Sequence, residues 1–230
     1  SIGITTCKRN NNFTKNLIKK IKMNGWDKIS LYAEPDSEVD NSVRVINRDM
    51  VYGCWTNWIC SLYDMYSIDI EADYYCIFED DIEICLGVKN YLENLLPSIE
   101  RFGAISLYTP SNQSRKSLGL NCIHDNSFMA ESVWGTQAIV FSKESLCRFL
   151  SSRNVFDHRR IGYGVNNKNR DTALGIWASK KKKKLFYHNP SLVQHIGKES
   201  SINHEYHYSS NFVGENYDAT LLIDKKIPII

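Results

Sequence analysis

The sequence predicts a single domain of the α/β class, with a mostly parallel central sheet flanked by helices. Short apolar segments alternate with amphipathic ones from residue 1 to about residue 108, which is the βαβ pattern of a parallel sheet. Hydrophobic residues make up 43% of the 230 residues, enough for a substantial core. No repeat and no linker-like stretch divides residues 1–230, so one domain is expected.

The elements of the first half follow from hydrophobic periodicity. The first helix carries Phe13, Leu17, Ile18 and Ile21 on one face, and Gly25 ends it. Two further helices are expected at 53–68, which is rich in aromatic residues, and at 88–99. Short β-rich apolar runs predict strands at 2–6, 29–33, 43–46, 74–78 and 104–107.

The second half is less regular. Residues 109–132 have no periodicity and many Ser and Asn residues, so a long loop is expected. A strand at 136–141 and a helix at 143–150 follow, and after a polar loop at 153–170 a short helix is expected at 171–179. Short strands are expected at 185–187 and 191–193, and a C-terminal segment that wraps the surface at 203–230.

The overall charge and the apolar runs exclude some classes of protein. The 28 basic and 26 acidic residues give a net charge of +2, which excludes a surface that is basic all over. No apolar run approaches the ~20 residues of a membrane span. The seven cysteines are scattered singly, which is typical of free thiols in a reducing compartment. We therefore expect a cytoplasmic protein.

An acidic triplet follows the strand expected at 74–78. Glu79, Asp80 and Asp81 stand where that strand should end, and in an open α/β sheet ligands bind at the carboxyl ends of the strands. Three adjacent carboxylates repel one another unless a cation or donor groups absorb the charge. Mn²⁺ or Mg²⁺ suits carboxylate oxygens and keeps open positions for phosphate oxygens. The triplet favours metal-dependent chemistry on a phosphorylated ligand, and a solvated strand end is the alternative.

Two motifs resemble a known family. The run YYCIFEDD at 74–81 resembles the DxD-type motif of GT-A glycosyltransferases, in the Glu-Asp-Asp form of N-acetylglucosaminyltransferases of the complex N-glycan pathway. The run PSLVQHIGKESS at 190–201 resembles an element of N-acetylglucosaminyltransferase IV-like enzymes, with about eight identities in twelve positions, and the tails of small bacterial and viral GT-A enzymes. The resemblance implies a Rossmann-like GT-A fold and a glycosyltransferase that uses a nucleotide sugar, by family a UDP-sugar.

The resemblance also implies roles for residues. Asp81 would bind the metal ion that bridges the diphosphate, and His195 could be a second ligand or a structural histidine. Residues 1–108 would form the nucleotide-sugar-binding half and residues 109–202 the acceptor and catalytic half. The expected donor contacts are Thr5, Thr6, Arg9, Glu34, Asp36, Glu79, Asp80, Gly135, Lys198, Ser200 and Ser201.

Asp171 is the candidate general base. An inverting transfer needs one carboxylate to accept the proton of the acceptor hydroxyl. Asp171 begins a segment, DTALGIW, that resembles the acid-led helix before the tail of the same enzymes, although an Asp at a helix start is equally typical of a cap. Asp125, Glu131 and Asp157 are alternatives, and a retaining enzyme would not need a base in this place.

The acceptor stays open between two classes. A glycan or glycoprotein is the commoner acceptor for this fold. The lysine run Lys180–Lys184, with Arg159 and Arg160 upstream, could instead contact DNA, as in a phage-type transferase that modifies a hydroxymethylated base. Residues 151–200 carry 11 basic and 3 acidic side chains, so one basic rim is compatible with the small net charge. An inactive module of the same fold that only binds carbohydrate or nucleotide is a further alternative.

Overall fold

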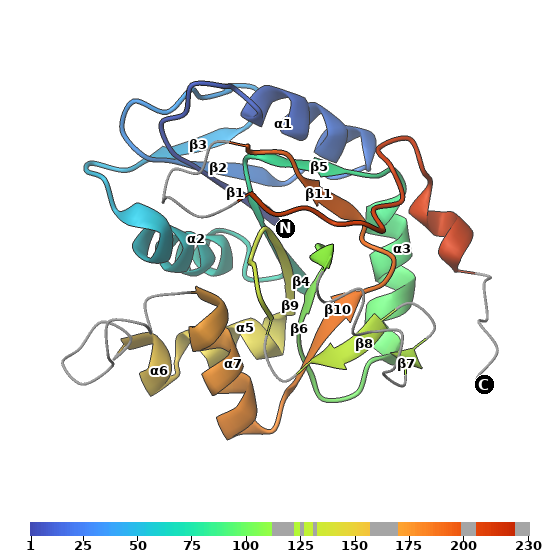
Figure 1. Cartoon of the computed structure of the whole chain (residues 1–230). Coiled ribbons are helices and arrows are strands. Elements are labelled where there is room, and N and C mark those ends of the chain that lie inside the picture. The colour runs from blue at the N-terminus through green and yellow to red at the C-terminus, as the bar shows by residue number, and fades with distance from the viewer. Residues whose placement is uncertain (112–121, 125–126, 131–132, 157–169, 199–205, 224–230) are drawn as a thin grey trace.

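The structure is a computed structural model that describes residues 1–111, 122–124, 127–130, 133–156, 170–198 and 206–223. Its central feature is a nine-stranded sheet in the order β3-β2-β1-β4-β9-β6-β10-β8-β7 (Figure 1). The strands are β1 (Ile2–Thr6), β2 (Ile29–Ala33), β3 (Arg44–Asn47), β4 (Tyr74–Glu79), β6 (Phe102–Ser106), β7 (Cys122–His124), β8 (Ser127–Ala130), β9 (Ala138–Ser142) and β10 (Lys184–His188).

The sheet is mostly parallel, as the sequence predicts. Strand β9 is antiparallel to its neighbours β4 and β6, and β8 is antiparallel to β10 and β7. The other seven strands described therefore run in one direction. A second sheet of two strands, β5 (Ile82–Ile84) and β11 (Val193–His195), brings the residues after β4 against the segment that contains His195.

Helices cover both faces of the large sheet. The apolar faces of α1 (Thr14–Met23) and α3 (Val88–Leu95) pack on one side. On the other side pack α2 (Gly53–Ile68), α5 (Lys143–Leu150) and α7 (Arg170–Lys181), with Trp58 and Trp177 fully buried. The shorter helical segments are α6 (Arg153–Phe156), η1 (Leu96–Ser98) and η3 (Ala219–Leu222). None of the described helices combines the length and apolar character needed to cross a bilayer.

Several sequence predictions differ from the structure. The polar loop expected at 153–170 begins with the helix α6, which is a single turn and too short to show a period. The long loop expected at 109–132 contains the strands β7 and β8, which have no periodic signal because they are only three and four residues long. The helix expected at 88–99 ends at Leu95 and continues as η1, since Pro97 has no backbone N–H to donate to a carbonyl of the preceding turn. The strand expected at 191–193 lies at Val193–His195, where it pairs with β5.

Candidate functional site

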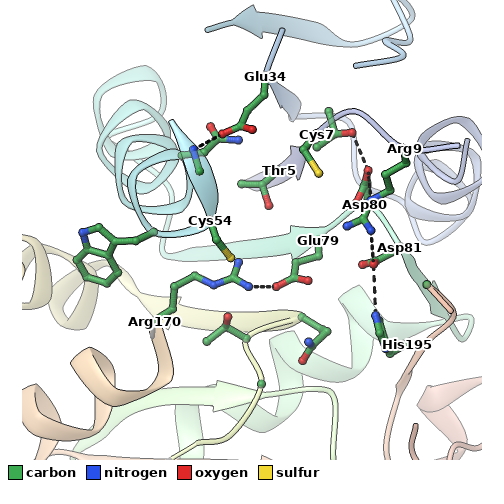
Figure 2. Close-up of a pocket in the computed structure, with 18 of the residues that line it drawn as sticks. Thr5, Cys7, Arg9, Glu34, Cys54, Glu79, Asp80, Asp81, Arg170 and His195 are labelled. Carbon is green, nitrogen blue, oxygen red and sulfur yellow. Dashed lines mark hydrogen bonds and ion pairs between the residues drawn. The ribbon is translucent and has the colours of Figure 1, made fainter. Parts of the chain in front are cut away.

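A pocket of about 730 Å³ opens where three parallel strands end (Figure 2). Strands β2, β1 and β4 are neighbours in register, so Glu34, Thr6 and Glu79 reach the same edge of the sheet. The volume is typical of a pocket for a small molecule or cofactor. The pocket also receives residues from the start of α7, from the segment before β9 and from the C-terminal segment.

The acidic triplet lines this pocket, and two arginines bind it. Glu79 forms an ion pair with Arg170, the first residue of α7. Asp80 and Asp81 are each only 3% exposed, and both lie against the guanidinium of Arg9. The charge that the sequence assigned to a cation or donor groups is thus absorbed in part by two basic side chains of the protein itself.

Asp80 is held from two sides. The hydroxyl of Thr6 donates to its Oδ2 at 2.6 Å, and the Nε of Arg9 lies 3.0 Å from Oδ1 and 3.2 Å from Oδ2. Burial raises the pKa of the Asp80 carboxyl to about 6, and the neighbouring charge of Asp81 adds to this, while Arg9 and Thr6 act in the opposite direction.

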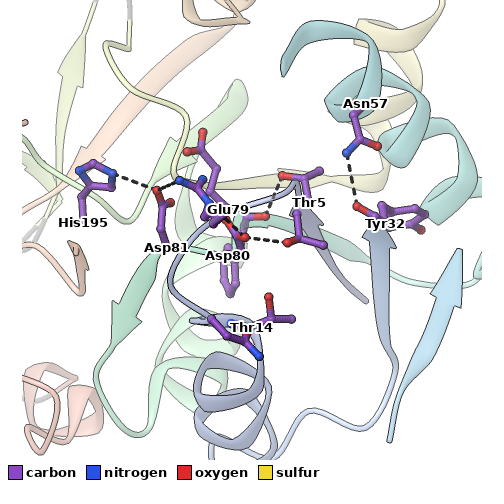
Figure 3. A network of polar contacts seen from close by, with 12 residues as sticks. Thr5, Thr14, Tyr32, Asn57, Glu79, Asp80, Asp81 and His195 are labelled. Carbon is purple, nitrogen blue, oxygen red and sulfur yellow. Dashed lines mark hydrogen bonds and ion pairs between the residues drawn. The ribbon is translucent and has the colours of Figure 1, made fainter. Parts of the chain in front are cut away.

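The two carboxylate oxygens of Asp81 differ in their contacts. Its Oδ2 lies 3.0 Å from the Nη1 of Arg9 and 3.3 Å from the Nε2 of His195 (Figure 3), whereas its Oδ1 is buried and has no hydrogen-bond partner among the described residues. Burial alone would raise the pKa of Asp81, but His195 and Arg9 outweigh burial and hold this pKa below its usual value. A buried carboxylate oxygen without a partner is costly unless a ligand satisfies it.

His195 is oriented through its second ring nitrogen. Its Nδ1 lies 2.9 Å from the backbone oxygen of His207, which can only accept, so Nδ1 donates and Nε2 faces Asp81. Burial alone would lower the pKa of His195, but the contacts with Asp81 outweigh burial and raise it. The rings of His195 and His207 stack, with centroids 4.4 Å apart and planes at 17°.

Asp81 and His195 fit a divalent cation only together with other ligands. No group of three or more His, Cys, Asp or Glu side chains in the described ranges is arranged to hold a metal ion. Two observations nevertheless favour a cation at Asp81. Its Oδ1 is buried and has no partner in the part of the chain that the structure describes. The Nδ1–H of His195 is fixed on a carbonyl, which is the usual way in which a ligating imidazole is oriented. Metal sites that bind nucleotides commonly have one or two protein ligands and complete the set with phosphate oxygens and water.

The expected donor contacts Thr5, Glu34 and Asp36 line the pocket beyond the triplet. The hydroxyl of Thr5 donates to the backbone oxygen of Phe78, and the Oε1 of Glu34 accepts from the backbone N–H of Gly53 at 2.6 Å. Asp36 is exposed and forms a 3.6 Å ion pair with Lys8.

Gly135 also lines the pocket, in the left-handed conformation with φ of 82°. A Cβ on this glycine would lie 2.5 Å from the Oε1 of Gln137. That amide oxygen is buried without a partner among the described residues, which makes Gln137 a second polar group available to a ligand.

Asp171 lies in the first turn of α7 and lines the pocket beside Arg170. Its Oδ1 accepts from the backbone N–H of Thr172 at 2.8 Å. The alternatives Asp125, Glu131 and Asp157 lie outside the described residues, as do Ser200 and Ser201 among the expected donor contacts and the basic residues Arg159 and Arg160. Lys198 is exposed and is not part of the pocket lining.

The lysine run lies at the end of α7 opposite to Asp171. At 1.5 Å per residue, the helix separates Asp171 from Lys181 by about 15 Å. Lys183 forms an ion pair with Glu144 at 3.2 Å. The structure thus does not bring the lysine run to the pocket.

Several pocket residues escaped the sequence analysis. No local pattern assigns Arg170, Tyr206, His207 or Gln137 individually to a ligand pocket. The C-terminal segment, which was expected only to wrap the surface, contributes Tyr206 and His207. The signal that the sequence did carry was the aromatic run HEYHY at 204–208, a short distance after His195.

Comparisons with known proteins show the fold and leave the family open. No family model matches the chain, and no curated protein matches its sequence. The fold matches that of a mannose-1-phosphate geranyltransferase from Thermus thermophilus, with a TM-score of 0.52 and 8% identity over 81% of this chain and 72% of that one. This match shows the α/β fold and, at such low identity, nothing finer.

Two further solved structures are more distantly similar. A CMP:2-keto-3-deoxy-manno-octonic acid synthetase complexed with CTP has a TM-score of 0.46 and 8% identity over 83% of this chain and 91% of its own. A mannosyltransferase from Pyrobaculum calidifontis in complex with GDP-Man and Mn²⁺ has a TM-score of 0.47 and 10% identity, over 80% of this chain and 53% of its own.

Proposed function

We propose that this chain is a metal-dependent glycosyltransferase that transfers a sugar from a nucleotide-sugar donor to a hydroxyl acceptor. The observation that carries the proposal is the Oδ1 of Asp81, which is buried without a partner among the described residues, in a pocket at the carboxyl edge of a parallel sheet. That edge is where open α/β sheets bind nucleotides. The resemblance of the Glu79–Asp81 motif to the GT-A family supports the same assignment and favours a UDP-sugar.

Residues of the first 108 positions bind the donor in this proposal. Glu34 and Asp36, at the end of β2, accept from the base or from ribose hydroxyls, with Thr5 and Thr6 beside them. Glu79 and Asp80 contact ribose or the donor sugar. Asp81 and His195 hold Mn²⁺ or Mg²⁺, which when bound neutralises negative charge on the diphosphate.

Residues 109–202 supply the acceptor side. The acceptor oxygen forms a bond to the anomeric carbon as the bond from that carbon to the diphosphate breaks, and Asp171 accepts the hydroxyl proton. The sugar is transferred with inversion. Gly135 and Gln137 lie beside the donor sugar. The Oε1 of Gln137, which has no partner within the described ranges, can accept from a sugar hydroxyl.

A glycan or glycoprotein is the proposed acceptor. DNA is the less favoured alternative, because the lysine run is about 15 Å along α7 from Asp171. A DNA acceptor predicts a gel shift that weakens steeply as salt rises from 50 to 200 mM. If the protein forms no complex with modified DNA, or forms one that is insensitive to salt, DNA is excluded as the acceptor.

The proposal is tested by a transfer assay with a panel of nucleotide sugars. The protein is incubated with each UDP-, GDP-, CDP- and dTDP-sugar and Mn²⁺, with glycan and DNA acceptors, and products are detected by mass spectrometry. One donor is expected to release its diphosphate and to label an acceptor, and Asp81→Asn is expected to abolish both. Binding of a nucleotide without transfer to any acceptor would favour the inactive module.

A further inference from the structure

Arg9 connects the two buried aspartates of the triplet. Its Nε contacts both oxygens of Asp80, and its Nη1 lies 3.0 Å from the Oδ2 of Asp81 (Figure 2). The Arg9 side chain is 14% exposed, so these contacts are shielded from water and salt. Asp80 and Asp81 together hold the pKa of Arg9 above its usual value although burial opposes this, so the guanidinium stays charged. Arg9 is therefore the counter-ion of both aspartates in this structure.

The same contact limits what Asp81 can offer to a metal ion. Arg9 and His195 both point at Oδ2, so only Oδ1 is available while Arg9 stays in place. A cation at Asp81 would also lie close to the positive guanidinium, and like charges in a buried site repel strongly. Metal binding is consequently opposed as long as Arg9 remains on Asp81.

A diphosphate in the pocket would compete with Asp81 for the guanidinium of Arg9. Six acidic and three basic side chains line the described pocket, so an anion entering it needs the few cations that are there. The acids are Glu34, Asp36, Glu79, Asp80, Asp81 and Asp171, and the bases are Lys8, Arg9 and Arg170. A guanidinium binds phosphate in a bidentate manner at least as well as it binds carboxylate. Arg9 lies beside the proposed metal ligand and is thus well placed to turn from Asp81 to the diphosphate.

We propose that Arg9 is an internal counter-ion that the nucleoside diphosphate draws away from Asp81, so that nucleotide and divalent cation bind with positive coupling. The inference rests on the proposed function and adds a coupling of affinities to it. The cation binds weakly alone and tightly when the nucleotide is bound. Coupling of this kind is reciprocal, so the cation must raise nucleotide affinity by the same factor.

The first experiment uses Mn²⁺ alone, followed by the electron paramagnetic resonance signal of the free ion. The wild type is compared with Arg9→Gln, with Asp81→Asn, and with Arg148→Gln, which makes the same chemical change in an exposed residue of α5. Arg9→Gln is expected to bind Mn²⁺ at least ten-fold more tightly than the wild type. Arg148→Gln should match the wild type, and Asp81→Asn should show no binding. Equal Mn²⁺ affinity in Arg9→Gln and the wild type would overturn the inference.

The second experiment needs no variant and remains valid if Arg9→Gln does not fold. Mn²⁺ affinity of the wild type is measured without nucleotide and with saturating UDP, GDP, CDP or dTDP. At least one diphosphate is expected to raise Mn²⁺ affinity ten-fold or more. A diphosphate that binds but leaves Mn²⁺ affinity unchanged contradicts the coupling. If no diphosphate binds, the proposed function fails instead, and the Arg9→Gln comparison with Mn²⁺ alone still decides the role of Arg9.

Discussion

Arg170 and Glu79 form a partly buried ion pair that joins the first residue of α7 to the last residue of β4. The two side chains are 12% and 14% exposed, so water solvates neither charge well. Asp171 follows Arg170 and Asp80 follows Glu79 in the chain. The pair therefore fixes the candidate general base relative to the acidic triplet.

Removal of one partner should destabilise the fold because it leaves the other charge unpaired and poorly solvated. Arg170→Met is expected to lower the free energy of unfolding by about 3–5 kcal/mol. Glu79→Gln should act in the same direction, and the double variant should lose less than the sum of the two. Urea unfolding measures the free energy of unfolding of all three variants.

The matched control is Arg148→Met, since Arg148 and its partner Glu144 are 60% and 61% exposed, and no measurable change in stability is expected there. An Arg170→Met variant as stable as the wild type would show that the pair does not hold this part of the site.

Gly197 packs directly on the carboxylate of Asp81. A Cβ at position 197 would lie 2.3 Å from Oδ2 and 2.9 Å from Cγ of Asp81, so an alanine must displace that side chain. We expect Gly197→Ala to weaken Mn²⁺-dependent nucleotide binding by about ten-fold or more, a loss of about 1.4 kcal/mol or more. Calorimetric titration measures the affinity, and circular dichroism checks that the fold is retained. Unchanged affinity would mean that the position of Asp81 does not limit binding.

Asp171 can be tested by an isosteric change. Asp171→Asn keeps an oxygen that can accept from the N–H of Thr172, and the variant should bind nucleotide as the wild type does. Loss of a general base should lower the turnover rate by about 10²–10⁴-fold. The turnover rate and the nucleotide affinity are measured on the same preparation. Retained transfer would remove Asp171 as the base and return the role to Asp125, Glu131 or Asp157.

The buried imidazole of His188 should make the free energy of unfolding depend on pH. It is fully buried; its Nδ1 donates to the backbone oxygen of Pro190, and its Nε2 accepts from the hydroxyl of Tyr91 at 2.7 Å. Burial lowers its pKa to about 4, below the 6.5 expected in the unfolded chain. Between these values the unfolded state binds a proton that the folded state does not, so stability falls as the pH decreases, by at most about 1.4 kcal/mol per pH unit.

The variant His188→Gln isolates this contribution. It lacks the titrating ring, so it should not share the loss of stability that the wild type shows at low pH. The difference in free energy of unfolding between wild type and variant, measured with urea, should therefore be smaller at pH 5 than at pH 7. A difference that is the same at both pH values would exclude His188 as the source.

Local pattern predicted the regular elements well. The helices at 53–68 and 143–150 have the predicted bounds because their apolar periodicity spans two or more turns. The strands β5, β7 and β8 escaped prediction, since three or four residues carry no period and their pairing partners lie far along the chain. Pairing with β11 is what makes Ile82–Ile84 a strand.

The candidate site was predictable where it follows a strand and unpredictable where it depends on long-range contact. Thr6, Glu34 and Asp80 are donor contacts that the family resemblance implies; each ends or directly follows a strand, and all three line the pocket. The partner of Glu79 is 91 residues away, and no local pattern marks Arg170 as an ion-pair partner rather than a surface charge. The same holds for His207, whose backbone oxygen orients His195 although its own sequence surroundings are those of a surface segment.

The most direct test of the central claim is a calorimetric titration of nucleoside diphosphates into the wild type and Asp81→Asn, each with Mn²⁺ and with EDTA. We predict that one diphosphate, UDP by family resemblance, binds the wild type in Mn²⁺ and binds neither the wild type in EDTA nor Asp81→Asn under either condition. Binding that is equal in Mn²⁺ and EDTA and unaffected by Asp81→Asn would contradict the account, as would the failure of all four diphosphates to bind.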